Sequence, residues 1–211
     1  TRYVYDANGN LRFVIDAEGG VTEHRYDATG QQLATLTYPR NRYDTSGFAT
    51  TDAPSLTTMA HWASAQDPGL ATRVDYQYDA RGQVVRMSAY AQLNADGTGL
   101  VDGSESTTSY AYDIAGNLIL KVDPDKNQTS YVYDGMNRLL SSTDATGRVT
   151  TNQYDDVNHV VTHTQVNGRV DTDIYDAAGQ LVTTVVGGVA RTQYRYDADG
   201  NVVETIDPTT G

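Results

Sequence analysis

A Tyr-Asp pair recurs in this chain at a constant step of 21 residues. The first two copies keep this step and so do the last five, whereas the third copy stands between longer intervals of 52 and 34 residues. The copies begin at Tyr5, Tyr26, Tyr78, Tyr112, Tyr133, Tyr154, Tyr175 and Tyr196. A fixed period of this size is typical of repeat proteins, in which each unit buries its apolar face by stacking on its neighbours. The sequence therefore predicts one repeat array that two insertions interrupt.

Each repeat predicts two short β-strands joined by a tight turn of the pattern Asp-x-x-Gly. Asp at the first position of a type I turn accepts hydrogen bonds from the amides of the turn, and Gly at the fourth position tolerates the left-handed conformation of a short hairpin loop. Where the fourth residue is not Gly it is Asn, which also adopts positive φ readily. These turn residues are Asp6 and Gly9, Asp27 and Gly30, Asp79 and Gly82, Asp113 and Gly116, Asp134 and Asn137, Asp155 and Asn158, Asp176 and Gly179, and Asp197 and Gly200.

A second turn is expected eleven residues after the repeat tyrosine. Asp16, Asp123, Asp144 and Asp207 occupy this position in four copies, and unrelated residues occupy it in the others. The geometry of the second turn is therefore expected to vary along the array.

A further tyrosine precedes the repeat tyrosine by two residues in five copies, at Tyr3, Tyr76, Tyr110, Tyr131 and Tyr194. Residues i and i+2 of a strand point to the same face. In successive hairpins these tyrosines are expected to form a ladder, in which the rings pack and the hydroxyls keep polar partners. Because the ladder repeats with the architecture, we interpret it as structural rather than as a ligand platform.

The first insertion, about residues 39–73, predicts a short helix that ends at Pro68-Gly69. One face of this helix is expected to carry Leu56, Met59, Ala60 and Ala63, with Trp62 beside it. The helix is expected to pack over one surface or end of the sheet. The alternative is a partner-binding lid with Trp62 as its anchor.

The second insertion, about residues 92–106, matches the twelve-residue calcium loop pattern, which places oxygen ligands at set positions around a Gly at position 6. The candidate calcium ligands are Asn94, Asp96, Thr98, Leu100, Asp102 and Glu105. Position 1 carries Asn rather than Asp, no helix flanks the loop, and a Gly/Asp-rich turn produces such matches by chance. Calcium is the one cofactor that the sequence suggests, and a plain turn is the alternative.

Composition limits the class of protein. A net charge of −12 argues against nucleic-acid binding, which relies on basic patches. A hydrophobic fraction of 38% and a mean hydropathy of −0.52 favour thin sheets with one solvent-exposed face over a compact globule. No run approaches 18 apolar residues, so no membrane span or signal sequence is expected in this segment. The chain has no cysteine, which fits both exported and cytosolic proteins.

No catalytic constellation is visible in the sequence. The four histidines, His24, His61, His159 and His163, fall at unrelated positions of the repeat, and there is no nucleophile elbow, phosphate loop or Cys-His arrangement. We therefore expect a protein that is not an enzyme.

The repeat Tyr-x-Tyr-Asp-x-x-Gly-Asn/Gln-Leu-x-x-x-x-Asp-x-x-Gly-x-x-Thr resembles the YD repeats of Rhs proteins. The clearest copies are residues 3–22, 110–129 and 131–150, and the match covers nearly the whole chain outside the insertions. The family includes bacterial Rhs polymorphic toxins, the B and C components of Tc toxins, wall-associated bacterial proteins and animal teneurins. The resemblance implies an all-β fold in which tandem antiparallel hairpins form a curved, spiralling sheet, a segment of a hollow β-shell.

A physical argument also predicts coiling, because open twisted sheets rarely exceed about ten strands without curling or closing. Residues 1–211 are expected to form a single array cut from a longer one, since the chain starts inside a strand and ends inside a turn. Its exposed sheet edges are expected to promote self-association.

The resemblance implies a structural wall segment that encloses a carboxy-terminal toxin or other cargo domain of the same parent chain. It also implies a secreted or cell-surface bacterial protein. The alternatives are an extracellular adhesion or carbohydrate-binding array, whose partner would be a glycan or a cell-surface protein, and a passive spacer.

Overall fold

The computed structural model describes residues 1–49 and 52–208. Within them, sixteen strands form one open antiparallel sheet whose strand order follows the chain. The strands are β1 (Arg2–Tyr5), β2 (Leu11–Ile15), β3 (Gly20–Tyr26), β4 (Gln32–Arg42), β5 (Thr72–Tyr78), β6 (Val84–Tyr90), β7 (Ser106–Tyr112), β8 (Leu118–Val122), β9 (Gln128–Tyr133), β10 (Leu139–Thr143), β11 (Val149–Asp155), β12 (Val160–Thr164), β13 (Val170–Tyr175), β14 (Leu181–Val186), β15 (Val189–Tyr196) and β16 (Val202–Ile206). The predicted all-β fold of tandem antiparallel hairpins is confirmed.

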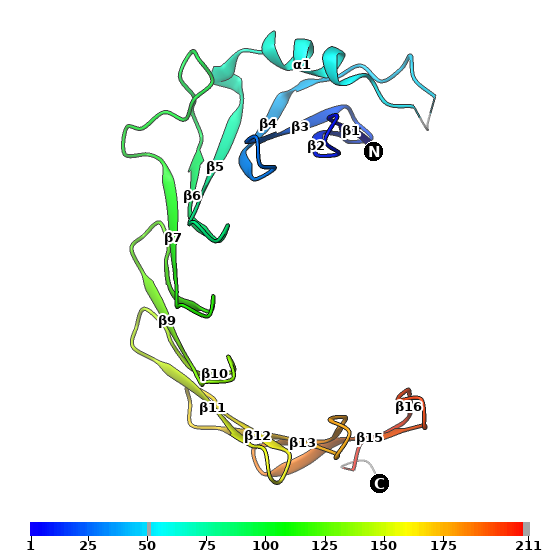
Figure 1. Cartoon of the computed structure of the whole chain (residues 1–211), viewed down its shortest axis with the longest axis vertical. Helices are drawn as coiled ribbons and strands as arrows, with labels where there is room; N and C mark the ends of the chain where they lie inside the picture. Colours follow the sequence, from blue (N-terminus) through cyan, green and yellow to red (C-terminus); the bar gives the residue numbers. More distant parts are fainter. Residues whose placement is uncertain (50–51, 209–211) are drawn as a thin grey trace. The chain divides into compact units, whose positions relative to one another are not determined.

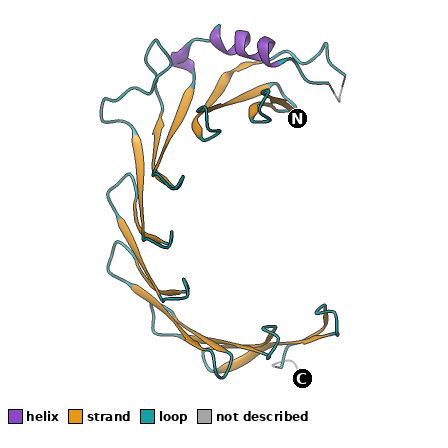
Figure 2. Ribbon diagram, in the orientation of Figure 1, coloured by secondary structure: helices purple, strands orange, loops and turns teal. Residues whose placement is uncertain are grey.

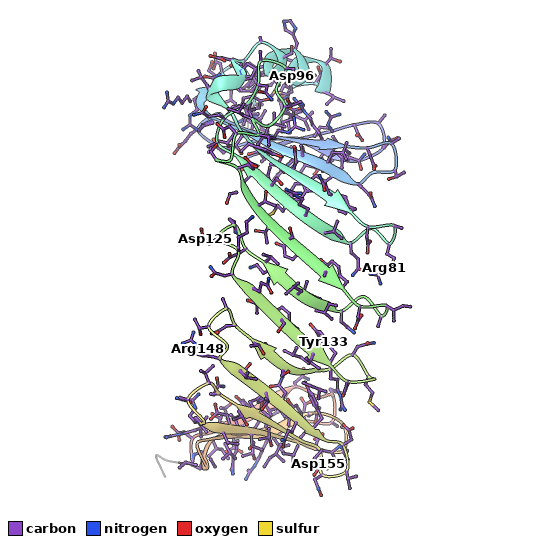
Figure 3. All side chains as sticks on the ribbon, turned by 90° about the vertical axis from the view of Figure 1, so that its left-hand side faces the viewer. Arg81, Asp96, Asp125, Tyr133, Arg148 and Asp155 are labelled. Carbon is purple, nitrogen blue, oxygen red and sulfur yellow. The ribbon has the colours of Figure 1, made fainter. Side chains whose placement is uncertain are left out.

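The two kinds of turn lie at opposite ends of the strands. Each Tyr-Asp turn leads from an odd-numbered strand to the next even-numbered one, and each second turn leads back. We call these two ends the first-turn side and the second-turn side. Figure 3 shows Asp155 on the first-turn side and Arg148 on the second-turn side of the second half of the chain. Both insertions replace a second turn, after β4 and after β6, so they leave the sheet on the same side.

The chain divides into two compact units, residues 1–110 with 123–125, and residues 111–122 with 126–211. In the first unit, helix α1 (Leu56–Ser64) covers one face of the sheet (Figures 1 and 2). The core lies beneath it and consists of Val4, Phe13, Ile15, Val21, Ala34, Leu36, Tyr38, Met59 and Ala71. Because side chains alternate along a strand, Tyr3 and Tyr5 point to the face opposite Val4, and they are 52% and 54% exposed.

Helix α1 begins after Ser55, whose hydroxyl caps the helix by accepting a hydrogen bond from the Thr58 amide at 3.1 Å. Met59 is fully buried, and the neighbouring apolar side chains Leu56, Trp62 and Ala63 pack against the core. The prediction that Ala60 lies on the same face is wrong, because Ala60 is exposed. One residue along a helix turns the side chain by about 100°, so Ala60 points away from the face that Met59 occupies.

The first insertion is shorter than the sequence indicated. Strand β4 continues through Pro39 to Arg42, which pairs with Gly20, and β5 begins at Thr72. Pro39 lies in a bulge, where the register jumps from Val21↔Tyr38 to Gly20↔Arg42, so its missing N–H breaks no ladder hydrogen bond. The short helix η1 (Pro68–Leu70) ends the insertion.

The second unit is a single sheet layer. Among its described residues, up to Pro208, every side chain is partly or fully exposed, and none is as buried as the core residues beneath α1. Apolar burial therefore stabilises this unit less than it stabilises the first, and the hydrogen bonds between strands and between turns carry a larger share of its stability.

Candidate functional site

Asp27 shows how the Tyr-Asp turn is built. Its Oδ1 atom accepts hydrogen bonds from the amides of Thr29 at 2.8 Å and Gln31 at 2.9 Å. The Asp27 amide donates to the Gln31 carbonyl, and the Gly30 amide donates to the Asp27 carbonyl. This is a type I turn followed by a left-handed residue that forms a bulge. The same pair of amide-to-carboxylate bonds occurs at Asp6, Asp16, Asp79, Asp134, Asp144, Asp176 and Asp197.

These hydrogen bonds favour the charged form of the carboxylate. The pKa of Asp27 is lowered from its ordinary value of 3.8, chiefly by the Thr29 side chain and then by the Gln31 amide. At Asp16 the amide of Gly20 is the largest cause of the lowered pKa. The turns therefore use ionised aspartate as a structural acceptor.

The fourth residue of the turn adopts the left-handed conformation. Gly30 has a φ of 87°, and Asn137 takes the same place with a φ of 63°. The expectation of a left-handed Asn158 is wrong, because the residue with positive φ in that loop is His159, at 55°. Here β11 and β12 pair up to Asp155↔Val160. The residue with positive φ is therefore the fourth after the turn aspartate, whereas it is the third in the other Tyr-Asp turns. The backbone N–H of Asn158 instead donates to Asp155 Oδ1 at 3.0 Å.

The second turns differ among themselves, as the sequence predicted. Asp144 and Gln165 both begin turns with the hydrogen-bond pattern of the first turn, closed at Gly147 and Gly168. Between β14 and β15 the connection is only Gly187-Gly188, with φ values of 59° and 84°. Two consecutive residues with positive φ match a type I′ hairpin, which accounts for the absence of an Asp at this place.

The repeat tyrosine joins one hairpin to the preceding one. In at least four repeats, its hydroxyl donates a hydrogen bond to a backbone carbonyl just beyond the preceding Tyr-Asp turn. These bonds are Tyr26 to Leu11 at 3.0 Å, Tyr78 to Gln32 at 2.8 Å, Tyr154 to Leu139 at 3.0 Å and Tyr196 to Leu181 at 2.7 Å. The same interaction spans 46 residues at Tyr78 and 15 at the others, so the first insertion leaves it intact.

The backbone ladder explains why this carbonyl needs a donor. Between β2 and β3 the ladder reaches Phe13↔Glu23 and stops, which leaves Leu11 beyond its end. Between β10 and β11 it stops at Ser141↔Thr151, before Leu139. The tyrosine hydroxyl supplies a donor there, since a backbone carbonyl without a partner costs stability. At Leu139 the side chain of Asn152 donates to the same carbonyl at 2.9 Å. Where β12 and β13 stay paired to Val160↔Ile174, the amide of Tyr175 donates to the carbonyl of His159 instead.

Side chains also link the turns of successive repeats. Asn117 Nδ2 donates to Asn137 Oδ1 at 2.8 Å. Arg138 donates to Asp134 at 2.7 Å and to Asp156 of the next repeat at 2.6 Å, and its guanidinium lies 4.2 Å from the centre of the Tyr154 ring. Polar and cation–π contacts thus connect three successive Tyr-Asp turns of the second unit, those that begin at Asp113, Asp134 and Asp155.

Polar side chains are linked across the strands where Asn152 and Asp173 occupy the position that a second tyrosine takes in other repeats. His163 Nδ1 lies 2.8 Å from Asn152 Oδ1, and His163 Nε2 lies 3.4 Å from Asp173 Oδ2. Thr184 donates to the other oxygen of Asp173 at 3.0 Å. These contacts cross from β11 to β14, so polar side chains connect four neighbouring strands here.

The candidate calcium ligands lie in a short hairpin and in the loop that follows it. Residues 93–99 form a small hairpin, in which Asn94 begins the turn and Gly97 has the positive φ of 77°. Asp96 accepts from Thr98, Asp102 from the Ser104 amide and Glu105 from the Gly103 amide. Among the described residues, no group of three or more His, Cys, Asp or Glu side chains could hold a metal ion. Calcium binding by this segment stays a prediction of the sequence alone.

The sequence profile of the family described as "Teneurin YD-shell" matches residues 1–169. This chain belongs to the teneurin YD-shell family. The profile described as "RHS Repeat" matches the remaining repeats, residues 175–211. Together the two profiles cover both insertions and every Tyr-Asp copy, so the predicted resemblance is confirmed.

Solved structures show the same fold at low sequence identity. The crystal structure of TcdB2-TccC3 matches 98% of this chain with a TM-score of 0.53 and 14% identity. The Tc holotoxin pore of Photorhabdus luminescens, with a substitution in TccC3, matches 96% with a TM-score of 0.53 and 18% identity. TcdB2-TccC3 without its hypervariable C-terminal region matches 98%, with a TM-score of 0.51 and 16% identity. This chain spans 14%, 11% and 11% of the lengths of those chains.

No curated protein sequence matches this chain. Neither helix in the described part of the chain has the length and apolar character that a bilayer crossing needs. YD-shell repeats are structural elements, and the geometry of the turns and tyrosines in this chain is that of a continuous scaffold.

Two features of this scaffold were not expected from the sequence. The acceptors of the tyrosine hydroxyls are backbone carbonyls, which no residue pattern marks. The second is the burial of Glu23, whose carboxylate side chain is only 4% exposed. Its position in a strand of alternating residues could have indicated this burial. Because Glu23 follows Val21 by two positions in the strand, the alternation itself predicts that Glu23 shares the buried face.

Proposed function

We propose that this chain is a section of the wall of a β-shell that encloses a cargo domain of its own parent protein, a toxin domain in the bacterial case. The observation that carries the proposal is the set of tyrosine-to-carbonyl hydrogen bonds, which join successive hairpins at the same position of the repeat. Such bonds suit a wall, because they hold neighbouring hairpins together where the backbone ladder has ended. Membership of the YD-shell family supports the same role.

A mechanical role needs no active site. The ionised aspartates accept hydrogen bonds from their own turns, and the histidines lie in separate surroundings. We therefore propose that the segment is not catalytic. We also propose that the parent protein acts outside the producing cell or at its surface, since an enclosed toxin is useful only after export.

Electron microscopy of the full-length parent protein tests the enclosure. We expect a hollow particle with additional density inside, and limited proteolysis should spare the enclosed domain until the shell is opened. An open or extended array whose carboxy-terminal domain is digested at the rate of the isolated domain would refute enclosure. That outcome would favour adhesion, and a glycan array would then separate a recognition surface from a passive spacer.

A further inference from the structure

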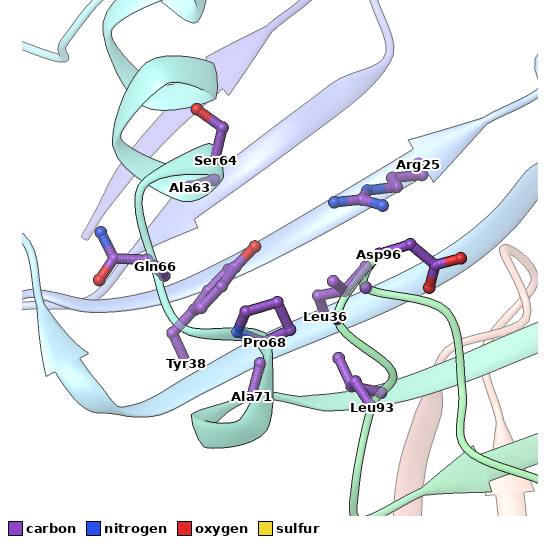
Figure 4. A pocket seen from close by; sticks show the side chains of 12 residues that line it. Arg25, Leu36, Tyr38, Ala63, Ser64, Gln66, Pro68, Ala71, Leu93 and Asp96 are labelled. Atoms are coloured by element: carbon purple, nitrogen blue, oxygen red, sulfur yellow. The ribbon is translucent and has the colours of Figure 1, made fainter.

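The two insertions meet over the helix-covered face of the first unit. Both replace second turns, so both emerge on the same side of the sheet. Between the end of α1, strands β3 and β4 and the hairpin at residues 93–99 lies a cavity of about 270 Å³ (Figure 4). The repeat strands form one side of the cavity, whereas the helix and the hairpin that close it both come from insertions.

The walls of the cavity are largely apolar. Leu36 and Tyr38 of β4 form one wall, Ala63 of α1 and Ala71 form another, and Leu93 closes it from the second insertion. Leu36 and Ala71 are 2% exposed and Tyr38 is 5% exposed, so these side chains are fixed by the core. A cavity of this size and lining fits a single aliphatic or aromatic side chain better than a larger ligand.

Arg25 lies at one end of the cavity with its guanidinium held in place. Its Nε and Nη2 atoms donate to Glu23 at 2.8 Å and 3.2 Å, and the Tyr38 hydroxyl donates to the same carboxylate at 2.8 Å. Among the described residues, the Nη1 atom of Arg25 has no hydrogen-bond partner. Figure 4 shows the Arg25 guanidinium pointing toward the cavity.

Asp96 stands beside the cavity on the second insertion. Its Oδ1 atom accepts from the amide and hydroxyl of Thr98 at 2.9 Å and 2.6 Å, and in the described part of the chain Oδ2 has no partner. Arg73 Nη1 donates to the Gly97 carbonyl at 2.7 Å, which anchors the hairpin to β5. Arg25 thus offers a free donor at one end of the cavity, and Asp96 offers a free acceptor oxygen beside it.

Two other polar side chains of the cavity, Gln66 and Ser64, already form hydrogen bonds within the protein. Gln66 accepts from Asn41 at 2.6 Å and donates to the Trp62 carbonyl at 2.6 Å, and Ser64 donates to the His61 carbonyl at 2.8 Å. A sugar would bury several hydroxyls without partners, at a cost for each one. A ligand with net charge would be attracted by one of Arg25 and Asp96 and repelled by the other, so the pair as a whole favours neither sign.

We propose that this cavity binds one apolar side chain of an extended, uncharged peptide segment. The peptide carbonyl accepts from Arg25 Nη1, its N–H donates to Asp96 Oδ2, and the side chain lies against Leu36, Ala63 and Leu93. A peptide supplies one acceptor and one donor per residue at no net charge, which matches the free groups of the cavity. The proposal does not depend on cargo enclosure, because all of its residues lie in the first unit.

The test uses the whole chain and three small probes. N-acetyl-leucinamide is titrated while methyl NMR signals of Ala63 and Leu93 are recorded, with N-acetyl-glycinamide and glucose as comparison probes. Trp62 is the single tryptophan and its ring lies 5.3 Å from that of Tyr38, so its fluorescence is a second readout. We expect saturable shifts with the leucine probe, and weaker binding of the glycine probe by about tenfold or more, since the apolar side chain carries the affinity.

Ala63→Leu fills the cavity, and Ala60→Leu adds the same side chain on the exposed side of α1. We expect the first to abolish probe binding and the second to leave it unchanged, with circular dichroism confirming that both variants fold. Asp96→Asn lies in an exposed hairpin and is expected to weaken binding several-fold without affecting folding. Equal binding of the leucine and glycine probes, unchanged binding in Ala63→Leu, or preference for glucose would each overturn the proposal.

Discussion

The hydroxyl of Tyr196 donates a 2.7 Å hydrogen bond to the backbone carbonyl of Leu181, one strand away and just beyond the preceding Tyr-Asp turn. The ladder between β14 and β15 has ended at Thr183↔Gln193, so no amide reaches this carbonyl in the ladder. The tyrosine of the repeat is thus a backbone partner as well as a packed ring, and the following prediction measures its contribution.

Removing this hydroxyl should destabilise the second unit. Tyr196→Phe keeps the ring but leaves the Leu181 carbonyl without its donor, and we expect a loss of about 1 kcal/mol in the free energy of unfolding. Urea denaturation followed by circular dichroism measures it. Tyr194→Phe is the matched control in the same strand, because among the described residues the Tyr194 hydroxyl has no partner. Equal losses in the two variants would contradict the assigned role.

The turn aspartates make stability depend on pH. The pKa of Asp27 is lowered in the folded state, and so are those of Asp16 and Asp144. A lowered folded pKa contributes stability that is fully present above the ordinary value of 3.8 and is lost as the pH falls through the lowered value.

Thermal unfolding between pH 7 and pH 2 should therefore show a melting temperature that falls below about pH 4. Asp27→Asn is the matched variant, since Asn forms the same turn without titrating. It should lose part of this acid dependence. A melting temperature that is the same at pH 5 and pH 2 would show that the turn carboxylates do not stabilise the fold.

The left-handed turn position should accept Asn but not a β-branched residue. Gly179 has a φ of 81°, and no neighbouring atom lies within 4 Å of the place that a Cβ would take, so any cost of substitution comes from the backbone conformation. We expect Gly179→Val to lose about 1–2 kcal/mol. Gly179→Asn should lose less, because Asn137 holds the same position in another repeat with a φ of 63°. Equal losses measured by urea denaturation would show that φ does not limit this position.

The helix should stabilise the first unit alone. Met59 is fully buried in the core beneath α1, and Met59→Ala is expected to cost about 2–5 kcal/mol. Hydrogen exchange should speed up in β2 to β5 and stay unchanged in β10 to β15, since the second unit does not share this core. Thr57→Ala, on the exposed side of the helix, is the control. Uniform acceleration along the whole chain would contradict an independent core.

The outer strand β16 should promote self-association of this chain. Val202 and Val203 are 51% and 61% exposed, and β16 has a partner strand on one side only in the described sheet. We expect the apparent mass in light scattering to rise with concentration, and Val203→Lys to reduce that rise. A mass that stays monomeric at millimolar protein would contradict edge pairing.

The turns show how far local sequence determines this fold. Asp27 and Gly30 carry the geometry of their turn within five residues, so the pattern Asp-x-x-Gly was enough to predict it. The loop at Asp155 was the exception, because the pairing of β11 with β12 moved the left-handed position to His159. A register set by two whole strands is not visible in four residues.

The sequence by itself determined the period, the hairpins and the family, since these depend on residues close together in the chain and repeated eight times. The tertiary structure alone decided what the two insertions do. Leu93 and Ala63 are far apart in sequence and carry no shared motif, yet both line one cavity because both insertions replace turns on the same side of the sheet. The buried Glu23, held by Arg25 and Tyr38, likewise depends on neighbouring strands and on the helix above them. Contacts of this kind arise from strand order and register, which bring distant residues together without marking them in the sequence.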